Sequence, residues 1–187
     1  DKNFTLCGPS LYPSVLDAGP NGGLTLTGTF SASSSASSNP QNQALILAGD
    51  NATEAGVCTL AGPIVDAMFG ETTYAITNII KRGAGTWRFA DNAERTWSGR
   101  LTVEAGKVQF DSLAPVGTVC SLGTGQNATP YSTLLLGGTL EYVGTSVQPA
   151  TDRTLGVGGN ATLRNASDKV LTMANVSAAT DGAVLTL

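Results

Sequence analysis

Residues 80–110 read IKRGAGTWRFADNAERTWSGRLTVEAGKVQF, and this stretch decides the fold class. Apolar residues stand two apart in three short segments, residues 87–89, 101–103 and 108–110. A period of two is typical of strands that bury one face. Glycines separate these segments, and glycine tolerates the backbone angles of sharp bends. We therefore expect Gly83 and Gly85 to form the corner before the first strand, Gly99 the next corner and Gly106 the third.

The same alternation recurs along the rest of the chain. Further short apolar segments are found at residues 24–26, 45–47, 134–136, 140–142 and 185–187. Strands of three to five residues do not form a stable flat sheet by themselves. In a β-helix, by contrast, stacked coils about 4.8 Å apart pair every short strand with the coils above and below.

The sequence therefore predicts an all-β fold, a right-handed parallel β-helix (β-solenoid) of about eight coils, at roughly 20 to 25 residues per coil. The low-complexity residues 31–43 are expected to form a flexible loop that protrudes from a coil. A β-sandwich or a pair of small antiparallel barrels is the alternative, because the turn residues suit these folds equally well.

Internal similarity suggests how the chain is organised. Residues 1–8 resemble residues 152–159, and weaker similarity continues downstream of both segments. We predict a single β-helical repeat segment over residues 1–187, with one long unit over 1–151 and the start of the next over 152–187.

Residues 80–110 resemble the autotransporter-associated β-strand repeat, also called the passenger-associated transport repeat. The similar features are the Lys-x-Gly-x-Gly-Thr start at Lys81, the strand at Trp87, the aromatic-Ser-Gly at Trp97 and the strand at Leu101. The resemblance is specific over these residues and weaker over most of the chain. It implies a β-helical scaffold in an exported surface protein, with no catalytic set and no cofactor. The presence of three cysteines differs from the family pattern, because exported passengers of this family usually contain few cysteines.

Composition excludes several classes of function. Ten Lys and Arg face fourteen Asp and Glu, for a formal charge of -4, and basic residues form no run, so nucleic-acid binding is not expected. No stretch approaches the roughly 18 apolar residues of a membrane span. The chain has no histidine, which removes Ser-His-Asp and Cys-His catalysis. A carbohydrate-cleaving β-helix could still use carboxylates and Arg, with Asp50, Glu54, Asp66 and Arg82 as candidates, although these residue types are also common at turns and corners.

The cysteines and aromatic residues leave alternatives open. Cys7, Cys58 and Cys120 lack metal-ligand spacing, so we expect buried thiols or one disulfide with one free thiol. Trp87 and Trp97 lie in repeat strands and are expected in the core. Tyr12 and Tyr131 stand beside prolines and are the better candidates for surface contacts.

These observations favour a structural or adhesive extracellular protein that forms a stalk, fibre or filament at a cell surface. We expect end-to-end self-association through open coil ends, and possible contacts with surface glycans. A carbohydrate-binding or carbohydrate-cleaving β-helix is the alternative.

Overall fold

The computed structural model describes residues 2–6, 13–32, 42–69 and 73–187. Short strands connected by turns make up nearly all of its regular structure, with one 3₁₀ helix, η1. The elements, in chain order, are β1 Phe4–Leu6, β2 Ser14–Asp17, β3 Thr25–Leu26, β4 Phe30–Ala32, β5 Gln43–Ala48, η1 Glu54–Gly56, β6 Cys58–Leu60, β7 Ile64–Val65, β8 Ala67–Phe69, β9 Thr73–Ala75, β10 Thr77–Lys81, β11 Thr86–Phe89, β12 Leu101–Val103, β13 Lys107–Phe110, β14 Thr133–Leu135, β15 Thr139–Tyr142, β16 Thr151–Val157, β17 Asn160–Asn165, β18 Met173–Ala178 and β19 Val184–Thr186.

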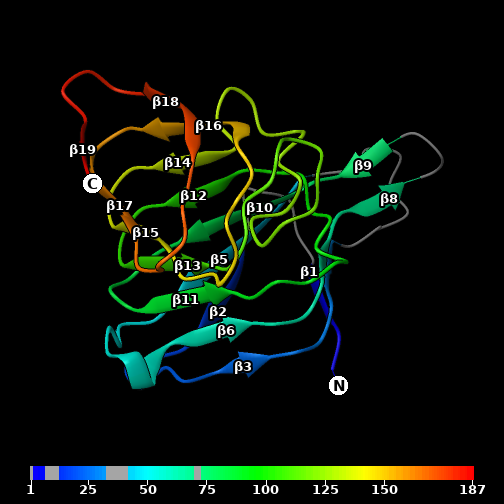
Figure 1. Ribbon diagram of the computed structural model, residues 1–187. Helices are drawn as coiled ribbons and strands as arrows, with labels where there is room; N and C mark the ends of the chain where they lie inside the picture. Colours follow the sequence, from blue (N-terminus) through cyan, green and yellow to red (C-terminus); the bar gives the residue numbers. More distant parts are fainter. Residues whose placement is uncertain (1, 7–12, 33–41, 70–72) are drawn as a thin grey trace.

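Two long parallel sheets run the length of the molecule. One seven-stranded sheet has the order β18-β16-β14-β12-β10-β5-β2, and the other has the order β19-β17-β15-β13-β11-β6-β3. We call them the first sheet and the second sheet. The chain visits the two sheets in turn, so each visit adds one strand to both, and Figure 1 shows the resulting coils stacked from blue to red. The expected parallel β-helix is confirmed, with seven such coils in the described residues.

Parallel register places chemically similar side chains above one another in the core. In the second sheet, Leu60, Phe89, Phe110 and Tyr142 follow each other across four adjacent strands. The ring centroids of Phe110 and Tyr142 are 5.4 Å apart. All four side chains are buried, and each contributes about 1.5–3 kcal/mol through the apolar area it removes from water.

The third side of the coil is less regular. Near the N-terminal end it is a three-stranded parallel sheet, β1-β4-β7. Beyond β7 the stacking continues without regular strands, since the Trp97 amide donates to the Ile64 carbonyl at 3.0 Å and the Thr124 amide donates to the Trp97 carbonyl at 2.9 Å. Trp97 is fully buried, as the sequence predicted, and so is Trp87.

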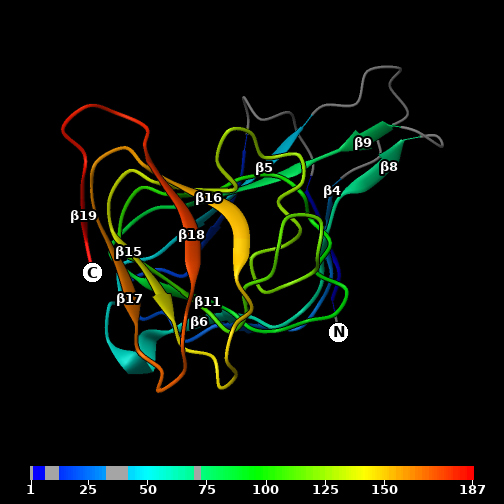
Figure 2. The same ribbon diagram turned by 45° about the horizontal axis from the view of Figure 1, so that its top comes forward.

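An antiparallel hairpin departs from the stacked pattern. Strands β8 and β9 pair antiparallel and project from one side of the coils in Figures 1 and 2. No pattern in the sequence indicates this hairpin. Of the loop predicted at 31–43, residues 31 and 32 belong to β4, residue 43 begins β5, and residues 33–41 lie outside the described residues.

The repeat boundary at residue 151 stays a prediction. Residues 4–6, which the internal similarity matches with residues 155–157, form β1 in the three-stranded sheet, whereas residues 155–157 belong to β16 in the first sheet. The matched segments therefore share a strand pattern and occupy different sides of the coil.

Candidate functional site

A column of glycines forms the corner between the first and second sheets. Gly83, Gly106 and Gly138 have φ angles of +70°, +69° and +70°, in the left-handed region that side chains disfavour. A Cβ on Gly83 would lie 2.7 Å from the Gly49 carbonyl oxygen, and one on Gly138 would lie 2.5 Å from that of Gly106. A Cβ on Gly106 would overlap the Gly83 oxygen. Each coil thus packs its corner backbone directly on the previous one.

At the other two predicted corner glycines, the backbone of the previous coil lies too close to leave room for a side chain. Gly85 follows Gly83 before β11, and a Cβ there would lie 2.7 Å from the Gly49 oxygen. Gly99 precedes β12, and a Cβ there would overlap the Thr77 carbonyl oxygen. Neither residue is among the glycines with positive φ.

A buried lysine donates hydrogen bonds to the backbone of this corner from the core. Lys81 lies in an inner row between Leu47 and Val103 and is fully buried. Its ammonium donates to the carbonyl oxygens of Arg82, Gly83 at 2.7 Å and Ala105 at 3.4 Å. Desolvation by burial lowers the pKa of Lys81 from 10.5 to about 8, against a smaller opposing effect of Asp50.

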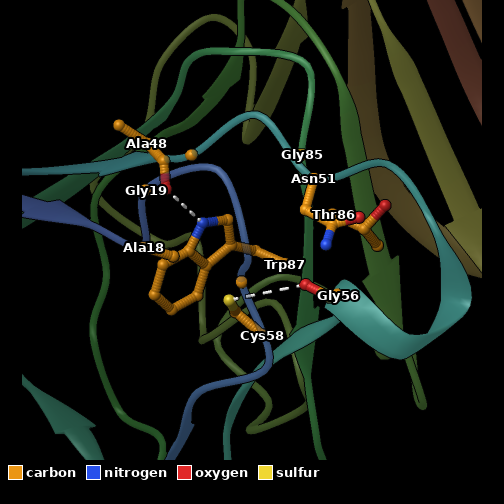
Figure 3. A pocket seen from close by; sticks show the side chains of 11 residues that line it. Ala18, Gly19, Ala48, Asn51, Gly56, Cys58, Gly85, Thr86 and Trp87 are labelled. Carbon is orange, nitrogen blue, oxygen red and sulfur yellow. Dashed lines mark hydrogen bonds between the residues drawn. The ribbon is translucent and has the colours of Figure 1, made fainter.

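Beside this corner, Trp87 and Cys58 fill the interior (Figure 3). The Trp87 indole Nε1 donates to the Ala48 carbonyl at 2.9 Å, and the Cys58 thiol points to the Gly56 carbonyl at 3.7 Å. The space left between these groups has no room for water. This interior region is packed core and offers no ligand site.

The described cysteines are buried thiols. Cys58 and Cys120 are both free, and their exposed fractions are 2% and 5%. Cys7 lies outside the described residues, as does Tyr12. Tyr131 is half-buried, and a Cβ on Gly156 would lie 2.6 Å from the Tyr131 ring, so this ring packs on the outer face of β16.

Two arginines are buried in the part of the coil that carries the longest connection, residues 111–132 between β13 and β14. Arg153 donates to five carbonyl oxygens, among them Ala114 at 2.5 Å and Gly123 at 2.7 Å. Arg95 donates to the carbonyls of Leu60 and Gly62 through Nη2, while its Nε and Nη1 have no partner among the described residues. Desolvation lowers the pKa of both, that of Arg95 to about 10. The sequence alone does not indicate either residue, because their partners are backbone carbonyls at least 29 positions away in the chain.

The structure gives the four candidate residues for carbohydrate cleavage separate surroundings. Asp66 accepts hydrogen bonds from Thr77 and Ser98 on the third side of the coil. Arg82 pairs with Glu104 at 2.6 Å, and Asp50 lies near Gly83 at the glycine corner. Glu54 lies in η1 and lines a groove that also contains Glu141. Burial is the main reason that the pKa of Asp66 is raised. The described residues contain no group of His, Cys, Asp or Glu that could hold a metal ion.

A polar groove of about 210 Å³ follows the outer face of the second sheet. Glu141, 3% exposed, accepts from Lys107 at 3.2 Å, from Gln109 at 2.7 Å and from Arg164 at 3.1 Å. Register explains the cluster, because Gln109, Glu141 and Arg164 occupy paired positions on adjacent strands. Lys107, Glu141 and Arg164 therefore satisfy one another, and Glu54 lines the same groove outside this cluster.

A larger groove of about 380 Å³ lies on the outer face of the first sheet, and residues 127–129 form part of its lining. Its lining combines amides, aliphatic side chains and one charged residue: Asn42, Ala44, Ile76, Asn78, Ile80, Arg100, Thr102, Asn127, Ala128 and Thr129. We call it the first-sheet groove. A volume in this range and a few convergent polar groups are typical of small-ligand sites.

Comparison with known proteins gives a distant relative. The chain is 36% identical over 104 residues to a protein named Adhesin BmaC autotransporter from Brucella suis biovar 1 (strain 1330). This chain is similar to an adhesin. The match covers 54% of the chain and 3% of the adhesin, so the chain spans a small part of its relative's length. No protein-family model and no solved structure matches the chain. In the part of the chain that the structure describes, no helix is long and apolar enough to cross a membrane.

Proposed function

We propose that the chain is a rigid β-helical scaffold segment of an adhesin-like protein displayed at a cell surface. The observation that carries this proposal is the pair of uninterrupted seven-stranded parallel sheets. Their hydrogen bonds run along the axis of the stack and would resist bending and extension. The similarity to an autotransporter adhesin supports the setting at the surface.

We further propose that the open C-terminal coil, β18 and β19, stacks on another β-helical coil. Val176 pairs in register with Leu155, which is fully buried, yet Val176 is 51% exposed, since β18 is the edge strand of the first sheet in the described residues. Leu185 likewise pairs with the buried Ala161 and is only partly buried. Unpaired strand edges next to apolar side chains favour addition of further strands.

Sedimentation velocity over a range of concentrations tests the stacking. The wild-type chain should form end-to-end assemblies, and a Val176→Lys/Leu185→Lys double variant should stay monomeric, because two charges would be desolvated on stacking. Val147→Lys is the matched control, since Val147 is an exposed valine outside the strands, and it should assemble like the wild type. A wild-type chain that remains monomeric at every concentration would contradict the stacking proposal.

A carbohydrate-cleaving role has less support. Asp66 and Arg82 are each engaged by other residues of the fold. Two carboxylates, Glu54 and Glu141, line the polar groove, and Glu141 is bound by three donors. Glycoside cleavage needs two available carboxyl groups that flank one bond, and the three donors already engage one of this pair.

A further inference from the structure

The first-sheet groove contains a cation, Arg100, that no carboxylate of the described residues pairs with. Arg100 uses Nε to donate to the Tyr131 carbonyl at 3.2 Å and Nη2 to donate to the Thr129 carbonyl at 2.7 Å. Its Nη1 has no hydrogen-bond partner within the described residues, and no acidic side chain lines the groove. The two carbonyl bonds fix the guanidinium plane, so the free edge is held in place before a ligand arrives.

The amides beside Arg100 also have unused hydrogen-bonding capacity. Asn78 Oδ1 accepts from the Arg100 backbone amide at 2.9 Å, and Asn127 Nδ2 donates to Ser98 Oγ at 2.7 Å. Each amide is thereby fixed by one atom. Within the described residues, the Nδ2 donor of Asn78 and the Oδ1 acceptor of Asn127 are left for a ligand.

The remaining surface of the groove is aliphatic. Ala44 lines it from β5, Ile80 from β10, and Ile76 from the position between β9 and β10. A ligand that matches the whole lining therefore presents a carboxylate to Arg100, hydroxyls to the two amides and C–H groups to the aliphatic surface. A sugar acid combines these three features in one ring.

The polar groove on the second sheet is the weaker candidate. Its two cations, Lys107 and Arg164, are both paired with Glu141. A ligand there would have to displace hydrogen bonds that already exist, at a cost that few new contacts would offset.

We infer that the first-sheet groove is a binding site for a carboxylate-bearing saccharide, with Arg100 contacting the carboxylate and Asn78 and Asn127 the hydroxyls. This site goes beyond the proposed scaffold role, and neither depends on the other. Binding brings the carboxylate against the guanidinium, where a charge-assisted hydrogen bond is roughly twice as strong as a neutral one.

Two variants at Thr102 distinguish the effect of an added charge on binding from the effect of added side-chain volume. Thr102 lines the groove from β12 and is half-buried, so Thr102→Glu adds a carboxylate near Arg100 and Thr102→Gln adds nearly the same volume without charge. Titrations would use a galacturonic acid trisaccharide and the neutral galactose trisaccharide, with the intact chain. Thermal unfolding of both variants should stay close to wild type, which checks that the groove is preserved.

The acidic trisaccharide should bind at least tenfold more tightly than the neutral one. Thr102→Glu should weaken acidic binding at least tenfold, and Thr102→Gln by less than threefold. Equal affinity for the two trisaccharides, equal effects of the two variants, or no binding of the acidic trisaccharide would each overturn the assignment. Sedimentation of the same samples reports coil stacking separately, so failure of one proposal is distinguishable from failure of the other.

Discussion

Gly106 joins β12 to β13 with a φ of +69° and faces the carbonyl oxygens of Gly83 and Gly85 in the previous coil. Gly106→Ala should lower the free energy of unfolding by several kcal/mol, because backbone strain and overlap with fixed carbonyls add together. Gly19→Ala is the matched control, since Gly19 has a φ of +62° and a methyl group there would have nothing within 4 Å. It should cost about 1–2 kcal/mol. If urea unfolding gave the same loss of unfolding free energy for both variants, the coils would not be in close contact at this corner.

Lys81 makes stability depend on pH in a predictable direction. Its pKa is about 8 in the folded chain, compared with 10.5 as the ordinary value. Between these values the unfolded state binds the proton and the folded state does not, so rising pH stabilises the fold. The stability of the wild type relative to Lys81→Met should therefore increase from pH 8 to pH 10.5. Groups common to both proteins cancel in this difference, and parallel pH curves would contradict the burial of the ammonium.

Side chains differ in how far the sequence predicts them. The burial of Trp87 and Trp97 followed from their place in period-two segments. Lys81, Arg95 and Arg153 are fully buried as well, and no pattern in the sequence indicates it. Their charges are tolerated because they donate to backbone carbonyls, which for the two arginines lie far away in the sequence. Only the three-dimensional path of the chain reveals those partners.

At the scale of elements, the connection over residues 111–132 depends on Arg153. Its five carbonyl contacts fasten a segment that contains no strand to the stack. Arg153→Met should destabilise the chain by about 3 kcal/mol or more, since hydrogen bonds to charged groups are strong and buried carbonyls would lose their donor. Hydrogen exchange should accelerate first within residues 111–132.

Arg164→Met provides the comparison for that experiment. Arg164 forms an ion pair with Glu141 instead of carbonyl contacts, and its side chain is 60% exposed. The change should cost less than about 1 kcal/mol and leave exchange in 111–132 unchanged. If both variants had the same effect, Arg153 would not anchor the connection.

Strands of the two long sheets were predictable because their pattern is local. Residues 101–103 were expected as a strand and form β12, and residues 87–89 and 140–142 lie within β11 and β15. The β8–β9 hairpin and the first-sheet groove were not predicted. The groove joins strands β5, β10 and β12 to residues 127–129, and sequence periodicity does not indicate which loop covers which strands.

At the scale of the whole molecule, the account depends on parallel stacking of the coils. The glycine corner, the stacked core side chains and the two grooves all require successive coils to lie in register. An antiparallel arrangement of the same strands was the alternative from sequence. It would pair β12 with β13 as a hairpin around Gly106, whereas the structure pairs β13 with β11 and β15.

The most direct test is the pattern of interstrand nuclear Overhauser effects in the isotope-labelled chain. Val108 should show backbone contacts to Trp87 on one side and to Leu140 on the other. Phe110 should correspondingly contact Phe89 and Tyr142, with the same strand direction in each pair. Contacts across a hairpin, with Val103 opposite Lys107 and Leu101 opposite Gln109, would contradict the parallel β-helix and the functions proposed from it.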